Sequence, residues 1–122
     1  MKINPSLIDL SSVTPVELYN DANGTTGTVN LSETSANFEY LEIFYKQAEY
    51  TSIYNSVKVY NPNGKKVSLV AIQSEGMGAG IASAYVSISG NKITKVGSNV
   101  YWTNSGNSNT DVMYITRVIG YK

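Results

Sequence analysis

Hydrophobic and polar residues alternate along this chain in many short segments, and β-branched and aromatic residues fill most of the hydrophobic positions. Alternation with a period of two is typical of strands, because successive side chains of a strand point to opposite faces. The best helical candidate, residues 32–37, is expected to form at most a single turn or 3-10 piece capped by Ser32. The pattern predicts strands at residues 16–20, 28–31, 40–46, 56–60, 66–72, 81–88, 92–96, 99–103 and 112–121.

Turn-forming residues separate these segments. The segment 61–64, Asn-Pro-Asn-Gly, combines a proline that fixes φ with an Asn-Gly pair that accepts positive φ, so it predicts a hairpin. Residues 89–91 and 97–99 are expected to be further tight connections. Short strands joined in this way favour an all-β, antiparallel β-sandwich or jelly-roll-like domain, or a small barrel, over a parallel sheet, which requires crossover helices.

The alternation also predicts which face of each strand is buried. In the strand 40–46, Leu41, Ile43 and Tyr45 share one face and are expected to lie in the core. One face of the strand 81–88 carries only small and aliphatic side chains, which predicts a close approach of the opposite sheet; these are Ala82, Ala84, Val86 and Ile88.

The last strand, residues 112–121, has hydrophobic groups on both faces. One face holds Met113, Ile115, Arg117, Ile119 and Tyr121, and the other holds Tyr114, Thr116, Val118 and Gly120. A strand of this kind is expected to be covered on both sides. The cover is either a neighbouring subunit that contacts Tyr114, Thr116 and Val118, or the chain itself, if the strand is central in a sandwich.

Length and charge bound the possible functions. A length of 122 residues predicts one domain, residues 16–122, that folds unaided and follows an N-terminal extension or anchor, residues 1–15. Nine basic and nine acidic residues balance, so no net charge directs the chain to nucleic acid or to an anionic membrane. No apolar run approaches the ~20 residues that span a bilayer, so no membrane insertion is expected.

Little in the sequence suggests catalysis or metal binding. There is no Cys and no His, which excludes disulfides, thiol nucleophiles and His-based sites. The glycine-rich segment 76–80 precedes a strand, whereas a phosphate loop leads into a helix. Asp21 lacks the other acidic positions of a calcium loop, and the remaining candidates are scattered carboxylates: Glu33, Glu39, Glu42 and Glu49. We therefore expect no enzyme activity, no metal and no cofactor.

Tyrosine is abundant, with ten residues, and is accompanied by many Ser, Thr, Asn and Gly residues. This mixture suits a recognition surface, although tyrosine is equally a strong strand former. The polar loop 104–110 follows an aromatic pair, and Asn amides beside aromatic rings are the usual means of binding sugars. If the loop is more than an ordinary hairpin tip, the expected ligand-binding residues are Tyr101, Asn104, Asn107 and Asn109.

Four segments carry a resemblance to a known family. They are residues 23–32, with the sequence NGTTGTVNLS, the strand 40–45, the hairpin 87–94 and the ending 114–122. With them, the chain from about residue 16 to residue 122 resembles the small all-β domain of appendage proteins in tailed bacteriophages. Such proteins are tail fibres, receptor-binding proteins and head fibre or decoration proteins. The resemblance implies a β-sandwich, commonly trimeric, and carries over no catalytic residues.

The resemblance also implies a function. The chain is expected to be a virion structural protein, made in the host cytoplasm and located in the virion. Its expected partners are copies of itself, other virion proteins and host cell-surface glycans. The alternative is a stand-alone carbohydrate-binding module, which requires an exposed row of Tyr or Trp on a monomer. A glycan-cleaving enzyme would require two carboxylates in one groove.

Overall fold

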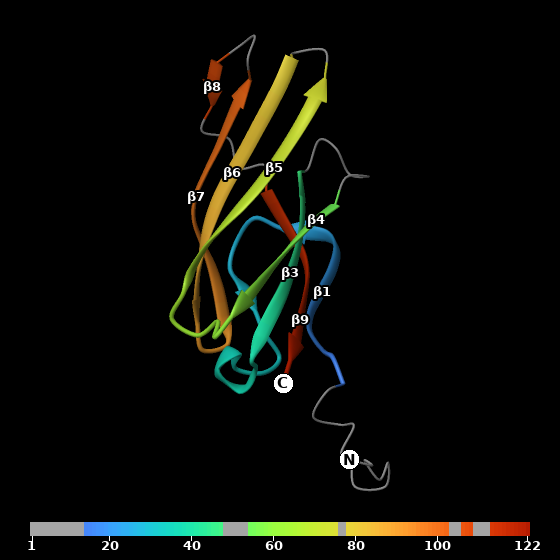
Figure 1. Cartoon of the computed structure of the whole chain (residues 1–122), viewed down its shortest axis with the longest axis vertical. Coiled ribbons are helices and arrows are strands. Elements are labelled where there is room, and N and C mark those ends of the chain that lie inside the picture. Colours follow the sequence, from blue (N-terminus) through green and yellow to red (C-terminus); the bar gives the residue numbers. More distant parts are fainter. Residues whose placement is uncertain (1–13, 48–53, 76–77, 103–105, 109–112) are drawn as a thin grey trace, which may run out of the picture.

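Two antiparallel β-sheets pack face to face in the computed structural model of the chain (Figure 1), which describes residues 14–47, 54–75, 78–102, 106–108 and 113–122. The strand order of the first sheet is β1 (Val16–Thr25), β9 (Met113–Tyr121), β3 (Tyr40–Gln47) and β4 (Tyr54–Tyr60). The order of the second is β2 (Val29–Asn30), β7 (Lys92–Trp102), β6 (Gly78–Ser89) and β5 (Lys66–Glu75), with β8 (Gly106–Ser108) paired to β7. The predicted all-β fold with two antiparallel sheets is confirmed, and its layers are those of a β-sandwich.

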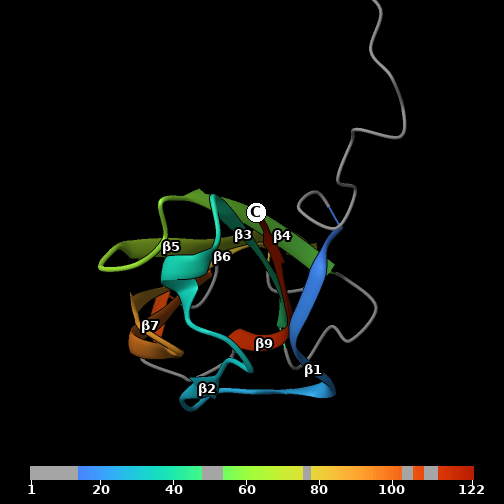
Figure 2. The ribbon, with the colours of Figure 1, turned by 90° about the horizontal axis from the view of Figure 1, so that it is seen from below.

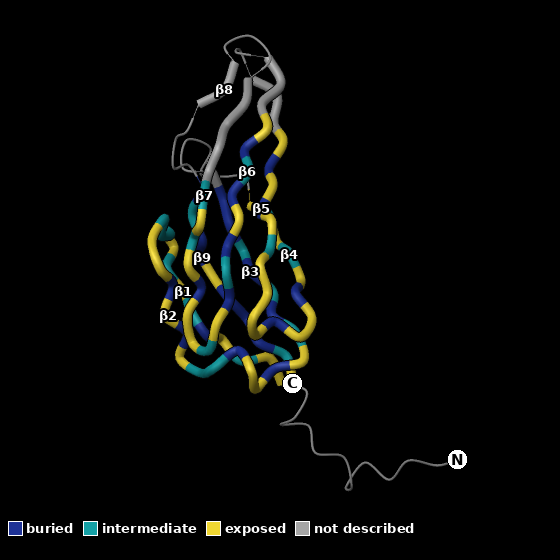
Figure 3. The backbone as a smooth tube through the Cα atoms, turned by 90° about the vertical axis from the view of Figure 1, so that its left-hand side faces the viewer, coloured by how far each residue is buried: buried dark blue, intermediate teal, exposed yellow. Residues whose placement is uncertain are grey.

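The core lies between the sheets, and buried positions alternate with exposed ones along the strands (Figures 2 and 3). Leu41, Ile43 and Tyr45 are buried, as predicted. The inward residues of β6 are also buried as predicted: Ala82, Ala84, Val86 and Ile88. Full burial of one aliphatic side chain stabilises a fold by roughly 1.5–3 kcal/mol, so these residues account for much of the driving force.

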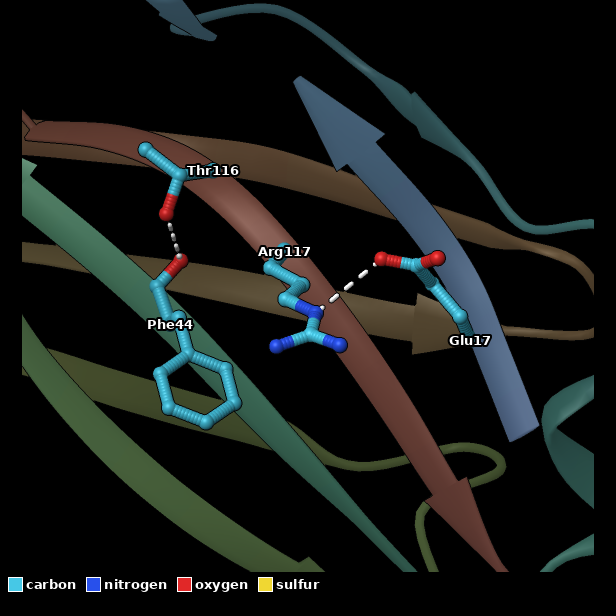
Figure 4. Close-up of polar contacts among 4 residues, drawn as sticks. All are labelled: Glu17, Phe44, Thr116 and Arg117. Carbon is cyan, nitrogen blue, oxygen red and sulfur yellow. Dashed lines mark hydrogen bonds and ion pairs between the residues drawn. The ribbon is translucent and has the colours of Figure 1, made fainter. Parts of the chain in front are cut away.

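A β-bulge in the last strand makes the predicted alternation of β9 wrong. Tyr45 of β3 pairs with Ile115, whereas its neighbour Phe44 pairs with Arg117. Thr116 is therefore an extra residue opposite this step, and the bulge shifts the alternation that follows by one position. The Thr116 side chain stays close to the backbone of the neighbouring strand, where its hydroxyl donates a hydrogen bond to the Phe44 carbonyl (3.3 Å, Figure 4).

As a result, the hydrophobic residues on both sides of the bulge point into the same core. Met113 and Ile115 precede the bulge and Val118 follows it, and all three are buried in the core cluster. Thr116 is buried and Tyr114 is half-buried. Val118 therefore has no exposed surface for a neighbouring subunit, and the strand is central, between β1 and β3.

The turn at residues 61–64 joins the two sheets, so the predicted hairpin is wrong. Gly64 has the expected positive φ, 88°, whereas the asparagine with positive φ is Asn61, at 48°, and not Asn63. However, β4 belongs to the first sheet and β5 to the second, and the turn is fixed against the end of β6. The Gly64 N–H donates to the Ile88 carbonyl (2.7 Å), and the Gly90 N–H donates to a side-chain oxygen of the turn (2.8 Å). Local turn chemistry does not determine which strands a turn connects.

Two further expectations need correction. The second sheet is longer than predicted, because β7 continues through residues 97–99 and β5 and β6 remain paired as far as Glu75 and Gly78. The 3-10 helix Ser35–Asn37 confirms a short turn within residues 32–37. Its cap is Thr34 rather than Ser32, since the Thr34 hydroxyl accepts from the Ala36 N–H (3.4 Å).

Tyr45 connects the two sheets through a polar contact inside the core. Its hydroxyl donates to the Val70 carbonyl of β5 (2.8 Å) and accepts from the Val70 N–H (3.1 Å). Burial raises the pKa of Tyr45 above its usual value, and the hydrogen bond with Val70 opposes this shift. One phenol thus forms hydrogen bonds with both backbone polar groups of Val70.

Replacing Tyr45 by Phe is expected to destabilise the fold by about 1–2 kcal/mol, because both polar groups of Val70 lose a partner. The free energy of unfolding in urea is the measurement. Tyr60→Phe is the matched control, since Tyr60 is 52% exposed on the first sheet. Equal stability of Tyr45→Phe and the wild type would show that water replaces the phenol without cost.

Candidate functional site

The outer face of the first sheet carries aromatic and charged side chains. Outward positions of β3 hold Tyr40, Glu42 and Phe44, and those of β4 hold Tyr54, Ser56, Lys58 and Tyr60. Beyond the bulge, β9 adds Arg117, Ile119 and Tyr121 to this face. Tyr40 and Phe44 are four residues apart on one strand, roughly 13 Å, so the face has two separate aromatic ends.

At one end, three tyrosines form a row across β4, β3 and β9. The rings of Tyr40 and Tyr121 are stacked, with centroids 4.4 Å apart and an interplanar angle of 9°, and Tyr60 lies 4.9 Å from Tyr40. The Tyr121 hydroxyl donates to Glu42 (3.4 Å), and burial, followed by the charge of Glu42, raises the pKa of Tyr121. Because the rings cover one another's faces, this row is a poor stacking platform for a flat ligand.

At the other end, the same face is hollowed into a depression of about 230 Å³. We call it the Arg117 depression; its lining residues are Asn20, Ala22, Phe44, Tyr54, Thr116 and Arg117. All four strands of the first sheet contribute to the depression. Asn20 of β1 pairs with Arg117 of β9, and Arg117 pairs with Phe44 of β3. Tyr54 lies on β4, the next strand. Side chains on paired strands are held in place by the sheet, so the lining is largely preformed.

The guanidinium of Arg117 is oriented by an ion pair. Its Nε–H donates to a Glu17 carboxylate oxygen of β1 at 3.0 Å, and the two side chains are 47% and 45% exposed (Figure 4). Figure 4 shows Arg117 and Phe44 side by side on adjacent strands. The bulge is what makes this arrangement possible, because it brings Arg117 to the outer face after Ile115 has pointed inward.

Tyr54 presents an aromatic face to solvent beside the depression. Its side chain is 56% exposed, and the ammonium of Lys46 lies 5.8 Å from its ring centroid. Lys46 pairs with Tyr54 across β3 and β4, and is only 7% exposed. Its ammonium also donates to the Ala22 carbonyl (3.2 Å), which places a positive charge at the wall of the depression.

A second depression, of about 250 Å³, lies between the 3-10 helix and the turn 61–64. Its lining is uncharged: Ser35, Ala36, Phe38, Asn61, Pro62 and Asn63. The buried Ser35 hydroxyl has no hydrogen-bond partner among the described residues. One unpaired hydroxyl in an uncharged lining does not specify a class of ligand.

The predicted ligand-binding residues are only partly described. Tyr101 of β7 and Asn107 of β8 pair with each other across the sheet, so the segment 106–108 is a strand rather than part of a loop. Asn104 and Asn109 lie outside the described residues. The Arg117 depression was not predicted, although alternation in the strand 40–46 already places Phe44 on an outward face. The outward position of Arg117 could not be predicted, because it depends on the bulge at Thr116 and the sequence pattern of the strand gives no sign of a bulge.

The outer face of the second sheet is apolar. Ile72 and Ile81 are directly paired across β5 and β6, and are 73% and 46% exposed. Together with their neighbours they form a surface that we call the apolar face: Val70, Ile72, Ile81, Tyr85 and Val96. The outward positions between these residues hold serines, Ser68 of β5 and Ser83 of β6, and the nearest outward charge on β5 is Lys66 beyond Ser68.

Within the described residues, no three acidic side chains come together in a way that could hold a metal ion. The described residues also contain no helix that is long and apolar enough to cross a membrane. No protein-family model matches the chain, and no curated protein matches it significantly.

Proposed function

We propose that the chain is a recognition domain of a bacteriophage virion appendage, and that it binds a host-surface glycan in the Arg117 depression. The observation that carries the binding proposal is the lining of this depression, with two aromatic rings, an Asn amide and an Arg on one rigid sheet. Aromatic rings stack on the C–H face of a sugar, and Asn and Arg bind its polar groups. The virion location rests on the resemblance of the sequence to appendage domains.

Copies of the chain are proposed to associate, as a trimer, through the apolar face. Monomeric proteins rarely expose large contiguous apolar patches, and the five residues of this face are each 43–73% exposed. The occupant we favour is another copy of the same chain. The five side chains of this face carry no charge, so two copies can meet there without like-charge repulsion between them. A charged partner would instead leave its charges buried and unpaired.

A stand-alone carbohydrate-binding module remains the second candidate, because Tyr54 and Tyr60 are both exposed on one outer face. The two candidates share the glycan site and differ in assembly. A trimer that co-purifies with virions supports the appendage, whereas a monomer that binds glycans supports the module.

Replacing Tyr54 by Ala is expected to weaken glycan binding about tenfold, because the depression loses its most exposed aromatic ring. Binding is measured on an array of neutral and acidic oligosaccharides and on purified bacterial cell-wall polysaccharides. Tyr60→Ala is the matched control, since Tyr60 is on the same face of the same strand and similarly exposed, at 52% against 56%.

The control variant should bind as the wild type does. Loss of binding in Tyr60→Ala, with Tyr54→Ala unaffected, would move the site to the tyrosine row. No binding by the wild-type chain to any of these glycans at millimolar concentration would remove the glycan proposal altogether.

A further inference from the structure

We infer that the Arg117 depression selects an anionic sugar residue, whose carboxylate or phosphate group is bound by the Arg117 guanidinium. This inference rests on the proposed glycan binding and specifies its chemical class. A neutral sugar needs only the aromatic rings and Asn20. An arginine in the same depression adds a group that favours negative charge.

The orientation of Arg117 leaves its terminal nitrogens for a ligand. Glu17 engages only the Nε–H, and among the described residues no other hydrogen-bond partner of this guanidinium is present. The two Nη nitrogens can therefore donate a pair of parallel hydrogen bonds, which matches the two oxygens of a carboxylate or phosphate. Glu17 holds the guanidinium in place, so less side-chain entropy is lost when the ligand binds.

Among the described residues, two cations lie at the depression, Arg117 and Lys46. Lys46 is a second cation at its wall, since its ammonium contacts the Ala22 carbonyl, and no carboxylate pairs with it within the described residues. Lys46 is nearly buried, so salt and water screen its charge less than that of an exposed lysine.

The other described carboxylates near the depression do not contact the guanidinium. Asp21 accepts a hydrogen bond from Tyr19 (3.4 Å), and these two residues alternate with Asn20 and Ala22, which line the depression. Glu42 is at the outward position of β3 next to Phe44, and it accepts a hydrogen bond from the Ser56 hydroxyl of β4 (3.3 Å). Glu17 is therefore the one described carboxylate in contact with the guanidinium, against two cations.

The ring of Phe44 provides a surface for the C–H face of the sugar. Phe44 pairs with Arg117 across β3 and β9, so a sugar held by the guanidinium lies over this ring. Tyr54 continues the aromatic surface at the side. The charged group of the ligand and its C–H face thus find complementary groups in one depression, which fixes the orientation of the sugar.

The test is isothermal titration calorimetry with three oligosaccharide probes. The first is an oligogalacturonate, the second is its neutral methyl ester, and the third is an oligosaccharide that carries phosphate ester groups. We expect wild-type affinity for at least one anionic probe to exceed that for the neutral ester about tenfold or more, and to fall with rising salt. Comparison of the two anionic probes tells whether carboxylate or phosphate is preferred.

Two variants act in opposite directions. Arg117→Gln should lower the affinity for the anionic probe about tenfold and leave the affinity for the neutral ester unchanged. Glu17→Gln should raise the affinity for the anionic probe several-fold, because the Gln carbonyl can still accept from the Arg117 Nε–H while the competing negative charge is removed. A purely structural ion pair would instead lower binding in both variants. Lys58→Gln is the matched control, since Lys58 is an exposed cation on the same face that does not line the depression.

The outcomes separate this inference from the proposed function. Equal affinity for the ester and both anions, with binding lost in Tyr54→Ala, overturns the anionic selectivity and leaves glycan binding intact. Loss of anion binding in Lys58→Gln equal to that in Arg117→Gln also overturns it, because the effect would then be one of overall charge. Absence of binding to all three probes and to the glycan array removes both.

Discussion

Replacing Gly120 by Val is expected to destabilise the fold by about 3 kcal/mol, because its side chain would occupy the place of the Phe38 ring. A Cβ at Gly120 would lie 2.5–2.8 Å from three atoms of this ring. The ring cannot move away easily, since Phe38 is 5% exposed and its N–H donates to the Ser35 carbonyl of the 3-10 helix (3.2 Å). Overpacking of this kind costs typically 1–3 kcal/mol, and valine adds three carbons. The measurement is the free energy of unfolding in urea.

Gly27→Val is the matched control for this prediction. A Cβ at Gly27 would meet only the Thr25 hydroxyl, at 3.6 Å, so the control should change stability by less than about 0.5 kcal/mol. The double variant Gly120→Val with Phe38→Ala should be less destabilised than the sum of the two single changes, because the cavity left by the ring accepts the valine. Strict additivity would contradict the contact between these residues.

The double variant Ile72→Lys with Ile81→Lys is expected to be a monomer under conditions where the wild-type chain forms a trimer. Ile72 and Ile81 are directly paired at one end of the apolar face, and two lysines there would be buried against a neighbouring copy that carries the same two lysines. Light scattering at micromolar concentration gives the mass, which should fall to the 13.2 kDa of one chain.

Ser56→Lys with Tyr60→Lys is the matched control for assembly. Both changes are on the exposed outer face of β4 in the other sheet, so they add the same charge and should leave the oligomer intact. Melting curves of all the variants show whether each is folded. A wild-type chain that is monomeric at micromolar concentration would remove the trimer proposal, and dissociation of the control would move the interface to the first sheet.

The main features of the fold can be predicted from sequence because the alternation in most strands is regular. The strand 40–46 shows this well: Leu41, Ile43 and Tyr45 are buried and Phe44 faces outward, as the period of two requires. The prediction fails where one residue changes the register. Thr116 is an ordinary strand residue in the sequence, and its extra position is visible only from the pairing of β9 with β3.

The connection between strands is harder to predict than the strands themselves. The turn at 61–64 has the expected positive φ at Gly64, although the second positive φ is at Asn61 rather than Asn63, and the turn joins different sheets. The contacts that decide this come from Ile88 and Gly90, more than twenty residues away. Such long-range contacts leave no local signal in the sequence.

The candidate site could be predicted only in part. An outward Phe44 signals an aromatic residue on an exposed face, but Asn20, Tyr54 and Arg117 come from three other strands. Their proximity depends on the strand order β1-β9-β3-β4 and on the bulge. The sequence instead pointed to the polar segment 104–110, because loop composition is visible locally whereas a surface assembled from several strands is not.

The contact between Tyr45 and Val70 affects whether another chain can add a strand to the second sheet. β5 is the edge strand of the second sheet, and an open edge is a template on which another chain can add a strand. The phenol already occupies both free polar groups of Val70, near the middle of β5. Another chain could pair with β5 at Val70 only by displacing the buried tyrosine. The contact therefore interrupts the open edge of the second sheet near its middle and opposes the addition of a continuous strand there.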